Sequence, residues 1–277
     1  MTKEKGFRIS KEVLLYFFLS LGAVSVAWPT IWMFLSVFKT TEEIMAVPPT
    51  FLPHTLDVQN FQNLFSRCLY FRSYLNSVII SVLRVSLVVF TASICGYIFA
   101  KFKFPGKNAL FILTLSTLMV PIQMEIIPLY LIIKKLGWVN TYQGIIAPSV
   151  VYAFGIFLVR QYMQGLPSDY IDAARIDGLS EFGIYLKIAI PLMKPALSIL
   201  TIITFLAAWG DLLWPLIVIN STEMRTIPLV LSALSAAGRT NYGLLLSGAA
   251  LATIPTLAVF FLFQTQFVKT AALSGIK

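Results

Sequence analysis

The sequence predicts an all-α, polytopic membrane protein with six transmembrane helices. Its mean hydropathy is +0.83, and 58% of its 277 residues are hydrophobic while only 12% are charged. Soluble globular domains carry about twice that share of charged residues. The apolar residues also fall into six long runs with at most one charge each. Crossing a hydrocarbon core about 30 Å thick takes roughly 20 helical residues, and every run reaches that length.

Each of the six expected spans is justified by its own run of apolar residues. Three runs contain no charge, and they cover residues 13–38, 136–159 and 240–268. Three runs contain one charge each, namely 74–100 with Arg84, 109–133 with Glu125, and 195–219 with Asp211. The first run resembles a signal peptide as far as Ser25-Val26-Ala27, but it continues about ten residues further, which favours a retained helix. Residues 1–277 are therefore predicted to form a single transmembrane domain.

The distribution of lysine and arginine predicts the orientation of the chain. If the N-terminus lies in the cytoplasm, the cytoplasmic segments hold 13 of these residues and the outer segments hold 7. Because basic residues accumulate on the cytoplasmic side, both termini are expected there. Residues 1–12 and 160–194 are then cytoplasmic, and residues 39–73 form an outer loop. The same rule accounts for the net charge of +9, which gives no reason to expect nucleic-acid binding.

The second of these cytoplasmic segments is a polar, helix-forming insert between two apolar spans. Ser168 is predicted to cap a helix that Gly178 ends in a left-handed conformation. Asp169 lies favourably at the positive end of that helix dipole. Ser180 is predicted to cap a second helix that begins at Glu181. The sequence therefore predicts a helix–turn–helix with a compact corner.

Several side chains of this insert suit contact with another protein. Ala173 and Ala174 are small, so a partner surface can approach closely. The apolar candidates are Tyr170, Ile171, Leu179 and Phe182, and the charged candidates are Asp172 and Arg175. An amphipathic helix lying on the bilayer surface is the alternative interpretation. It explains the apolar residues but not the spacing of the motif that contains them.

That motif resembles the EAA loop of ABC importer permeases. In that family Glu-Ala-Ala is followed after three residues by Gly and, nine residues later, by Ile-x-Leu-Pro. Here Asp172-Ala173-Ala174 is followed by Gly178 and by Ile188-Ala189-Ile190-Pro191. Asp172 departs from the usual Glu and keeps its charge on a shorter side chain.

The resemblance covers nearly the whole chain and points to the carbohydrate-importing branch, in particular to the smaller permease of maltose-type importers. The supporting segments are Ser36-Val37-Phe38-Lys39, Tyr74-Leu75-Asn76-Ser77, Met119-Val120-Pro121, Asn140-Thr141-Tyr142-x-Gly144, Ile176-Asp177-Gly178, Trp209-x-Asp211 with Pro215, and Ser274-Gly275-Ile276-Lys277. Gly210 departs from the family, which often has Asn after the Trp.

The resemblance implies a type I ABC importer permease fold in the cytoplasmic membrane of a prokaryote. It implies a complex with a homologous second permease, two ATPase subunits and an external solute-binding protein, with a sugar or oligosaccharide as substrate. The residues expected to couple to the ATPase are Tyr170, Ile171, Asp172, Ala173, Ala174, Arg175, Gly178, Leu179 and Phe182. The sequence has no Gly-x-x-x-x-Gly-Lys-Ser/Thr loop, so ATP and Mg are expected on the partner subunits. No catalytic residue, cofactor or metal site is expected in this chain.

Three charges within the predicted spans are costly in lipid and should face a cavity or each other. We predict that Arg84 pairs with Glu125 or Asp211 beside the translocation path. Gln123, Tyr130 and Trp209 offer hydrogen bonds and stacking to a sugar. The alternative interpretation is a static ion pair that holds helices together, with the aromatic residues serving as packing anchors.

Three other functions remain as alternatives. An ABC permease for a non-sugar solute would share the Asp-Ala-Ala loop. An ion-driven secondary transporter would be expected to contain internal repeats with paired broken helices, and no repeat is visible in the sequence. An intramembrane enzyme would need a metal or nucleophile constellation, whereas the chain holds one His and neither His-Glu-x-x-His nor Gly-x-Ser-x-Gly.

Overall fold

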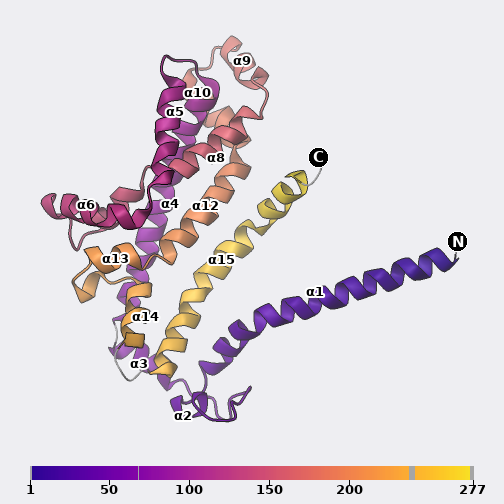
Figure 1. The fold of residues 1–277 in the computed structure, drawn as a ribbon, viewed down its shortest axis with the longest axis vertical. Coiled ribbons are helices and arrows are strands. Elements are labelled where there is room, and N and C mark those ends of the chain that lie inside the picture. The colour runs from indigo at the N-terminus through magenta and orange to yellow at the C-terminus, as the bar shows by residue number, and fades with distance from the viewer. Residues whose placement is uncertain (1, 68, 237–240, 275–277) are drawn as a thin grey trace. The chain divides into compact units, whose positions relative to one another are not determined.

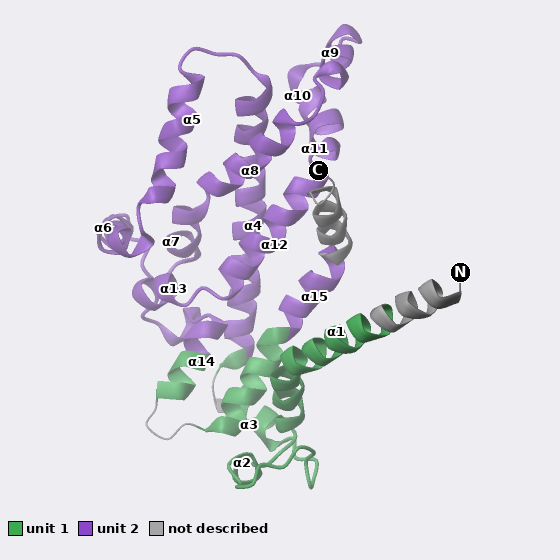
Figure 2. Ribbon diagram, turned by 45° about the vertical axis from the view of Figure 1, so that its right-hand side comes forward, with its two compact units in different colours: residues 1–70, 231–253 green, residues 71–230, 254–277 purple. Residues whose placement is uncertain are grey.

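The computed structural model describes residues 2–67, 69–236 and 241–274, and its side chains within residues 12–66, 69–236 and 241–263. All secondary structure in these ranges is helical (Figure 1). The chain divides into two compact units, residues 1–70 with 231–253 and residues 71–230 with 254–277 (Figure 2). Residues 275–277 of the terminal Ser-Gly-Ile-Lys segment lie outside the described ranges. The single transmembrane domain stays a prediction.

The first unit contains the long N-terminal helix and the segment that follows it. Its elements are α1 (Thr2–Ser36), α2 (Thr41–Ile44), α3 (Gln59–Arg67), the end of α14 (Ile227–Ala236) and the first part of α15 (Tyr242–Ser274). Inside this unit the Tyr70 hydroxyl donates a hydrogen bond to the Gly248 carbonyl at 2.6 Å. A Cβ at Gly248 would lie 2.7 Å from Leu231 Cδ2, so glycine permits α14 and α15 to approach closely.

The segment after α1 is ordered by polar side chains. Asn60 is buried and donates to the Lys39 carbonyl at 2.8 Å. Glu43 Oε1 accepts hydrogen bonds from the Thr50 hydroxyl at 2.9 Å and from the His54 amide at 3.0 Å. The bonds to the Lys39 carbonyl and the His54 amide satisfy backbone groups that a non-helical segment leaves without helical partners.

The second unit holds most of the helices. Its elements are α4 (Tyr70–Lys101), α5 (Lys107–Ser116), η1 (Thr117–Met119), α6 (Ile122–Lys135), α7 (Tyr142–Ile146), η2 (Ala147–Ser149), α8 (Ala153–Gln164), α9 (Asp169–Ile176), α10 (Glu181–Ile184), the π-helical η3 (Tyr185–Ala189), α11 (Ile190–Leu192), α12 (Lys194–Trp209), α13 (Leu213–Val218) and η4 (Thr222–Met224), with the start of α14 and the rest of α15.

Small residues bring α4, α8 and α12 together in this unit. A Cβ at Gly96 would lie 2.6 Å from Val159 Cβ, and one at Gly155 would lie 3.1 Å from Ala92 Cβ and 3.0 Å from Leu200 Cδ1. Close approach of backbones is how helices pack where lipid supplies no hydrophobic drive. The buried cluster formed here continues to Ile171 and Ile184 of the α9–α10 region.

Three helical segments are long and apolar enough to cross a membrane alone: Glu12–Ser36, Tyr70–Lys101 and Tyr242–Phe263. Three further pairs meet the same criteria together. They are Lys107–Met119 with Ile122–Lys135, bent by 101°, Tyr142–Ser149 with Ala153–Gln164, bent by 43°, and Glu181–Leu192 with Lys194–Trp209, bent by 75°. The described residues thus hold at least three spans, and six if each bent pair is one span. The N-in and C-in orientation stays a prediction.

Three of the predicted spans are not continuous helices. The span 136–159 is divided between α7 with η2 and the separate α8. The span 109–133 breaks before Pro121, because a residue that precedes proline disfavours the helical conformation, and Val120 is extended with ψ 117°. In the span 195–219, α12 ends at Trp209, and a separate α13 starts at Leu213. Asp211 therefore lies in a helix break and not on a helix.

Candidate functional site

The α9–α10 loop has the helix–turn–helix geometry that the sequence predicts. Gly178 has φ +81°, a left-handed conformation that costs glycine nothing. The Leu179 amide donates to the Ala174 carbonyl, and the Gly178 amide donates to the Arg175 carbonyl, both at 3.0 Å. This pair of bonds is the Schellman arrangement that satisfies the last carbonyls of a helix. The predictions for Gly178 and for the α10 helix are confirmed.

The two predicted serine caps have different outcomes. The Ser180 hydroxyl accepts a hydrogen bond from the Gly183 amide at 3.2 Å, so Ser180 caps α10 as predicted. The Ser168 prediction is wrong. Ser168 has helical φ and ψ of −79° and −14°, whereas a capping residue is normally extended. Its hydroxyl instead accepts a hydrogen bond from Lys101 Nζ at 3.2 Å.

Helix α9 presents two different faces. Ile171 and Ala174 are only 2% and 5% exposed and belong to the buried cluster of this unit. They are therefore packed inside the chain, so the close approach expected over Ala174 is not available on this side of the helix. Ala173 is exposed, as are Asp172 and Arg175.

The exposed apolar side chains of the loop form a separate set. Tyr170 is 59% exposed and Phe182 is 69% exposed. Ile176, which the sequence analysis did not select, is 87% exposed. Leu179 is half-buried against the cluster. The sequence did contain a signal that Ile176 belongs to the exposed face. It lies three residues after Ala173, which is exposed, and residues three apart on a helix are neighbours.

Arg175 lies between two carboxylates of the same loop. Its Nη1 is 2.9 Å from Asp172 Oδ1, and its Nε is 2.7 Å from Glu181 Oε1. The hydrogen bond to Glu181, followed by that to Asp172, raises the pKa of the Arg175 guanidinium above its usual value. The expected pair of free charges for a partner is therefore an internal network, and Glu181 is a member that the sequence analysis missed.

Two contacts connect this loop to α4. Lys101 Nζ donates to the Leu166 carbonyl at 2.6 Å as well as to Ser168. The buried Tyr185 hydroxyl lies 2.7 Å from the Ser93 hydroxyl. Because Ser93 also bonds the Phe90 carbonyl at 2.8 Å within its own helix, Tyr185 is the donor of the shared bond. The start and the end of the loop are thus both attached to the same long helix.

Arg84 pairs with Asp211, one of its two predicted partners. Arg84 Nη1 lies 2.9 Å from Asp211 Oδ2, and the two side chains are 18% and 20% exposed. Asp211 Oδ1 is 3.4 Å from the Trp214 amide, so the carboxylate also meets the start of α13. Among the side chains that the structure describes, Glu125 takes part in no ion pair, and it lies exposed in the first turn of α6.

The other predicted path residues take part in contacts of their own. Trp209 is 7% exposed, stacks on Phe205 at a centroid distance of 5.7 Å, and meets Tyr74 edge-on at 5.6 Å. Tyr130 packs against a second buried cluster, and Gln123 is exposed on α6. Trp209 and Tyr130 therefore have packing environments within this chain.

Two of the segments that resemble the family, residues 74–77 and 140–144, meet through their side chains in the second unit. Asn76 Nδ2 donates to the carbonyls of Glu223 and Arg225, and Asn76 Oδ1 accepts from the Tyr142 hydroxyl at 2.7 Å. Asn140 adopts φ +59°, and its side-chain oxygen accepts from the amides of Asn220 and Ser221. These residues build the framework of the 219–227 segment.

No group of three or more His, Cys, Asp or Glu side chains within the described residues is arranged to hold a metal ion.

The helical fold has a counterpart in a solved ABC importer. The structure of a bacterial ABC transporter involved in import of the acidic polysaccharide alginate superposes with a TM-score of 0.80 and 22% identity, over 92% of this chain and 95% of that one. At that identity the likeness shows the fold alone.

The chain belongs to the family of binding-protein-dependent transport system inner membrane components, whose model matches residues 92–272. Members are permeases and not enzymes. Among its relatives is an arabinooligosaccharide transport permease of Halalkalibacterium halodurans, 36% identical over 95% of this chain and 97% of the relative. Another is a lactose transport permease of Rhizobium radiobacter, 36% identical over 93% and 94%. The inner-membrane family agrees with the apolar spans.

Proposed function

We propose that this chain is a permease subunit of an ATP-driven importer for a sugar or oligosaccharide in a prokaryotic cytoplasmic membrane. The observation that carries the proposal is the similarity, over more than nine-tenths of the chain, to relatives named as arabinooligosaccharide and lactose permeases. A homologous second permease would supply the other half of the translocation path. The chain would have the type I permease arrangement with both termini in the cytoplasm.

The α9–α10 loop is proposed to dock to an ATPase subunit, which would bind ATP and Mg. Tyr170, Ile176 and Phe182 support this role, because large apolar side chains that are more than half exposed on a cytoplasmic loop suit a partner surface. Ala173 between them lets that surface approach closely. Ile171 and Ala174 support docking indirectly. Their burial fixes α9 on the core of this chain and so holds its exposed face in place.

The route from the loop to the spans runs through the helices that follow it. Closure of two ATPase subunits would displace the loop, and η3 and α11 join the loop directly to α12. The Tyr185 hydroxyl adds a bond to α4. An external solute-binding protein would deliver the sugar, and Arg84 with Asp211 would lie beside its path as a positioning pair.

Purification from the native membrane in mild detergent, with mass spectrometry of the proteins recovered, tests the assembly. An ATPase subunit and a second permease are expected. Recovery of the chain alone or as a homodimer, from membranes that contain such subunits, would favour an ion-driven secondary transporter. ATPase activity of the reconstituted complex with its binding protein, measured with arabinooligosaccharide, lactose and glycerol phosphate, would then separate sugar from non-sugar substrates.

The coupling role is tested by Gly178→Val with Gly137→Val as the matched control. Both glycines have positive φ, +81° and +71°, and neither has an atom within 4 Å of an added Cβ. Both substitutions impose comparable backbone strain. We expect Gly178→Val to abolish stimulation of the ATPase by binding protein and Gly137→Val to retain it. Equal effects of the two variants would remove the support for docking at this loop.

A further inference from the structure

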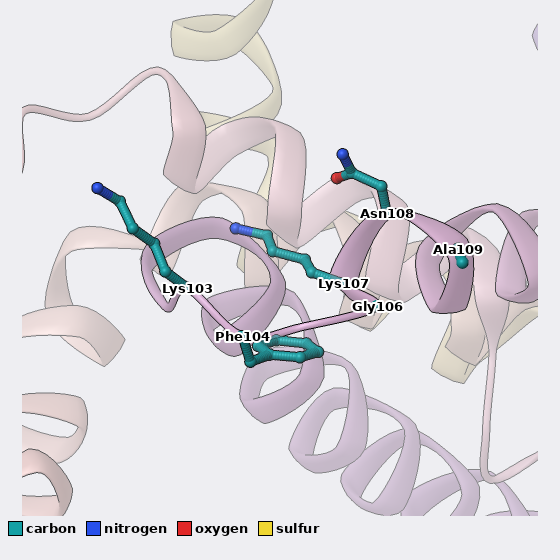
Figure 3. A pocket seen from close by; sticks show the side chains of 6 residues that line it. All are labelled: Lys103, Phe104, Gly106, Lys107, Asn108 and Ala109. Carbon is teal, nitrogen blue, oxygen red and sulfur yellow. The ribbon is translucent and has the colours of Figure 1, made fainter.

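A basic pocket lies at the turn between α4 and α5, outside the coupling loop and the ion pair already described. It has a volume of about 340 Å³ and is lined by Lys103, Phe104, Gly106, Lys107, Asn108 and Ala109. The Lys103 and Lys107 side chains extend on the same side of the turn, and the Phe104 ring lies against its backbone (Figure 3).

Two lysines line this pocket without a counter-charge, and an arginine lies close by. Lys103 and Lys107 belong to the lining, and Arg160 contacts Phe99, whose ring packs against Phe104 of the lining. Among the described side chains, none of these three takes part in an ion pair. Elsewhere in the same unit Arg84 and Arg175 do have carboxylate partners. Like charges held together repel one another, so an anion bound among them would be favoured.

The cations are held in place but retain donors for a ligand. Lys107 Nζ donates one hydrogen bond, to the Phe102 carbonyl at 2.8 Å, and an ammonium has three donors. The Arg160 guanidinium lies 3.8 Å from the centroid of the Phe111 ring, and its Nε donates to the Phe99 carbonyl at 3.4 Å. Phe99 in turn contacts both Phe104 and Phe111. The aromatic rings thus form a fixed base beneath the charges.

The position of the pocket selects the kind of anion. One candidate span ends at Lys101, and the next begins at Lys107, so the turn lies at the headgroup layer of one leaflet, whichever way the chain is oriented. Exposed apolar side chains of α5 begin directly beyond the pocket: Leu110 is 50% exposed, Ile112 66% and Leu113 65%. A ligand with a phosphate group and an apolar tail fits both surfaces, whereas a free phosphate uses only the first.

We propose that this pocket binds the phosphate of an anionic phospholipid, with the acyl chains lying along α5. Basic clusters at the end of a membrane helix are attracted to anionic headgroups. The site does not depend on which solute the permease transports, so it stands or falls separately from the proposed function.

The test uses the whole complex purified from its membrane, titrated in detergent with phosphatidylglycerol, phosphatidylcholine or inorganic phosphate and read by native mass spectrometry. We expect one phosphatidylglycerol to bind in preference to phosphatidylcholine. In Lys103→Gln/Lys107→Gln its affinity should fall about 30-fold, as expected for the loss of two basic residues near an anionic surface. Lys134→Gln/Lys135→Gln, which removes two lysines from the last turn of α6, is the matched control and should leave that affinity within twofold.

Lys103→Arg/Lys107→Arg keeps both charges and should keep the bound lipid, which separates loss of charge from loss of folding. Equal binding of the two phospholipids, or an unchanged affinity in the glutamine variant, would overturn the proposal. Displacement of phosphatidylglycerol by inorganic phosphate at the same concentration would overturn it too, because the ligand would then be a free anion.

Discussion

Arg175 of the α9–α10 loop and Arg84 of α4 are both paired with carboxylates, but the two pairs are built differently. The partners of Arg175 are three and six residues away, and its side chain is 38% exposed. The partner of Arg84 is 127 residues away, and its side chain is 18% exposed. The loop pair therefore forms from local geometry, whereas the Arg84 pair exists only when distant helices have packed. Their removal should affect stability to very different extents.

The largest effect is expected for Asp211→Ala. It leaves the Arg84 guanidinium, whose side chain is only 18% exposed, without its counter-charge, and breaking a buried pair in this way costs about 3–5 kcal/mol. The free energy of unfolding in detergent measures the loss. The double variant Arg84→Met/Asp211→Leu should recover most of that stability. If it also recovers transport, the pair is a static support and not part of the translocation path.

Trp209→Ala should cost somewhat less, about 3–4 kcal/mol, because it removes a buried ring that stacks on Phe205 and meets Tyr74. Gln123→Ala, at an exposed position of α6, should stay within about 0.5 kcal/mol. Unfolding measurements on both variants check this order. If a Trp209→Phe variant keeps its stability but shifts the sugar concentration for half-maximal transport, Trp209 does contact the substrate.

Adjacent residues of α9 separate folding from docking. Ile171→Ala should lower the free energy of unfolding by about 2–3 kcal/mol, because it leaves a cavity in the core. Tyr170→Ala should leave stability within about 0.5 kcal/mol while reducing the stimulation of the ATPase. If Tyr170→Ala lowers stability as much as Ile171→Ala and leaves the ATPase unaffected, α9 is a packing element only.

Of the two ion pairs, the smaller effect is expected for Arg175→Ala. Partly exposed ion pairs contribute about 0.2–1 kcal/mol, and the effect should shrink further in 1 M salt because surface charges are screened. Arg175→Lys should not restore the full value, since an ammonium cannot reproduce the forked contact with two carboxylates. A loss above about 2 kcal/mol would show that the loop network is as important to the fold as the Arg84 pair.

The difference between local and long-range contacts also explains which features could be predicted from the sequence. Gly178 and Ser180 were predictable because a left-handed turn and a cap are decided within a few residues. Ser168 was mispredicted because its competing partner, Lys101, lies 67 residues away. The burial of Ile171 and Ala174 likewise depends on α4 and α8, whose packing no local signal describes.

Within the predicted spans, the charged residues gave a clearer prediction of contacts than the aromatic residues did. The cost of an unpaired charge in lipid was enough to predict that Arg84 has an acidic partner, although the choice between Glu125 and Asp211 needed the fold. Trp209 and Tyr130 were selected as aromatic residues, and the structure gives both packing contacts. Hydropathy identified the three continuous apolar helices but not the 101° bend before Pro121 or the end of α12 at Trp209.

The π-helical turn η3 has a consequence for how this stretch tolerates a change in length. In that turn the hydrogen bonds span one residue more than in an α-helix, so the turn takes about one residue more to complete a full rotation. In a regular α-helix, which rotates by about 100° per residue, an extra residue would turn everything before it by that angle. The wide turn at Tyr185–Ala189 absorbs the extra residue locally. Deleting one residue there would leave α9 and its exposed side chains with nearly the same heading, so the stretch can change length by one codon without re-aiming the loop.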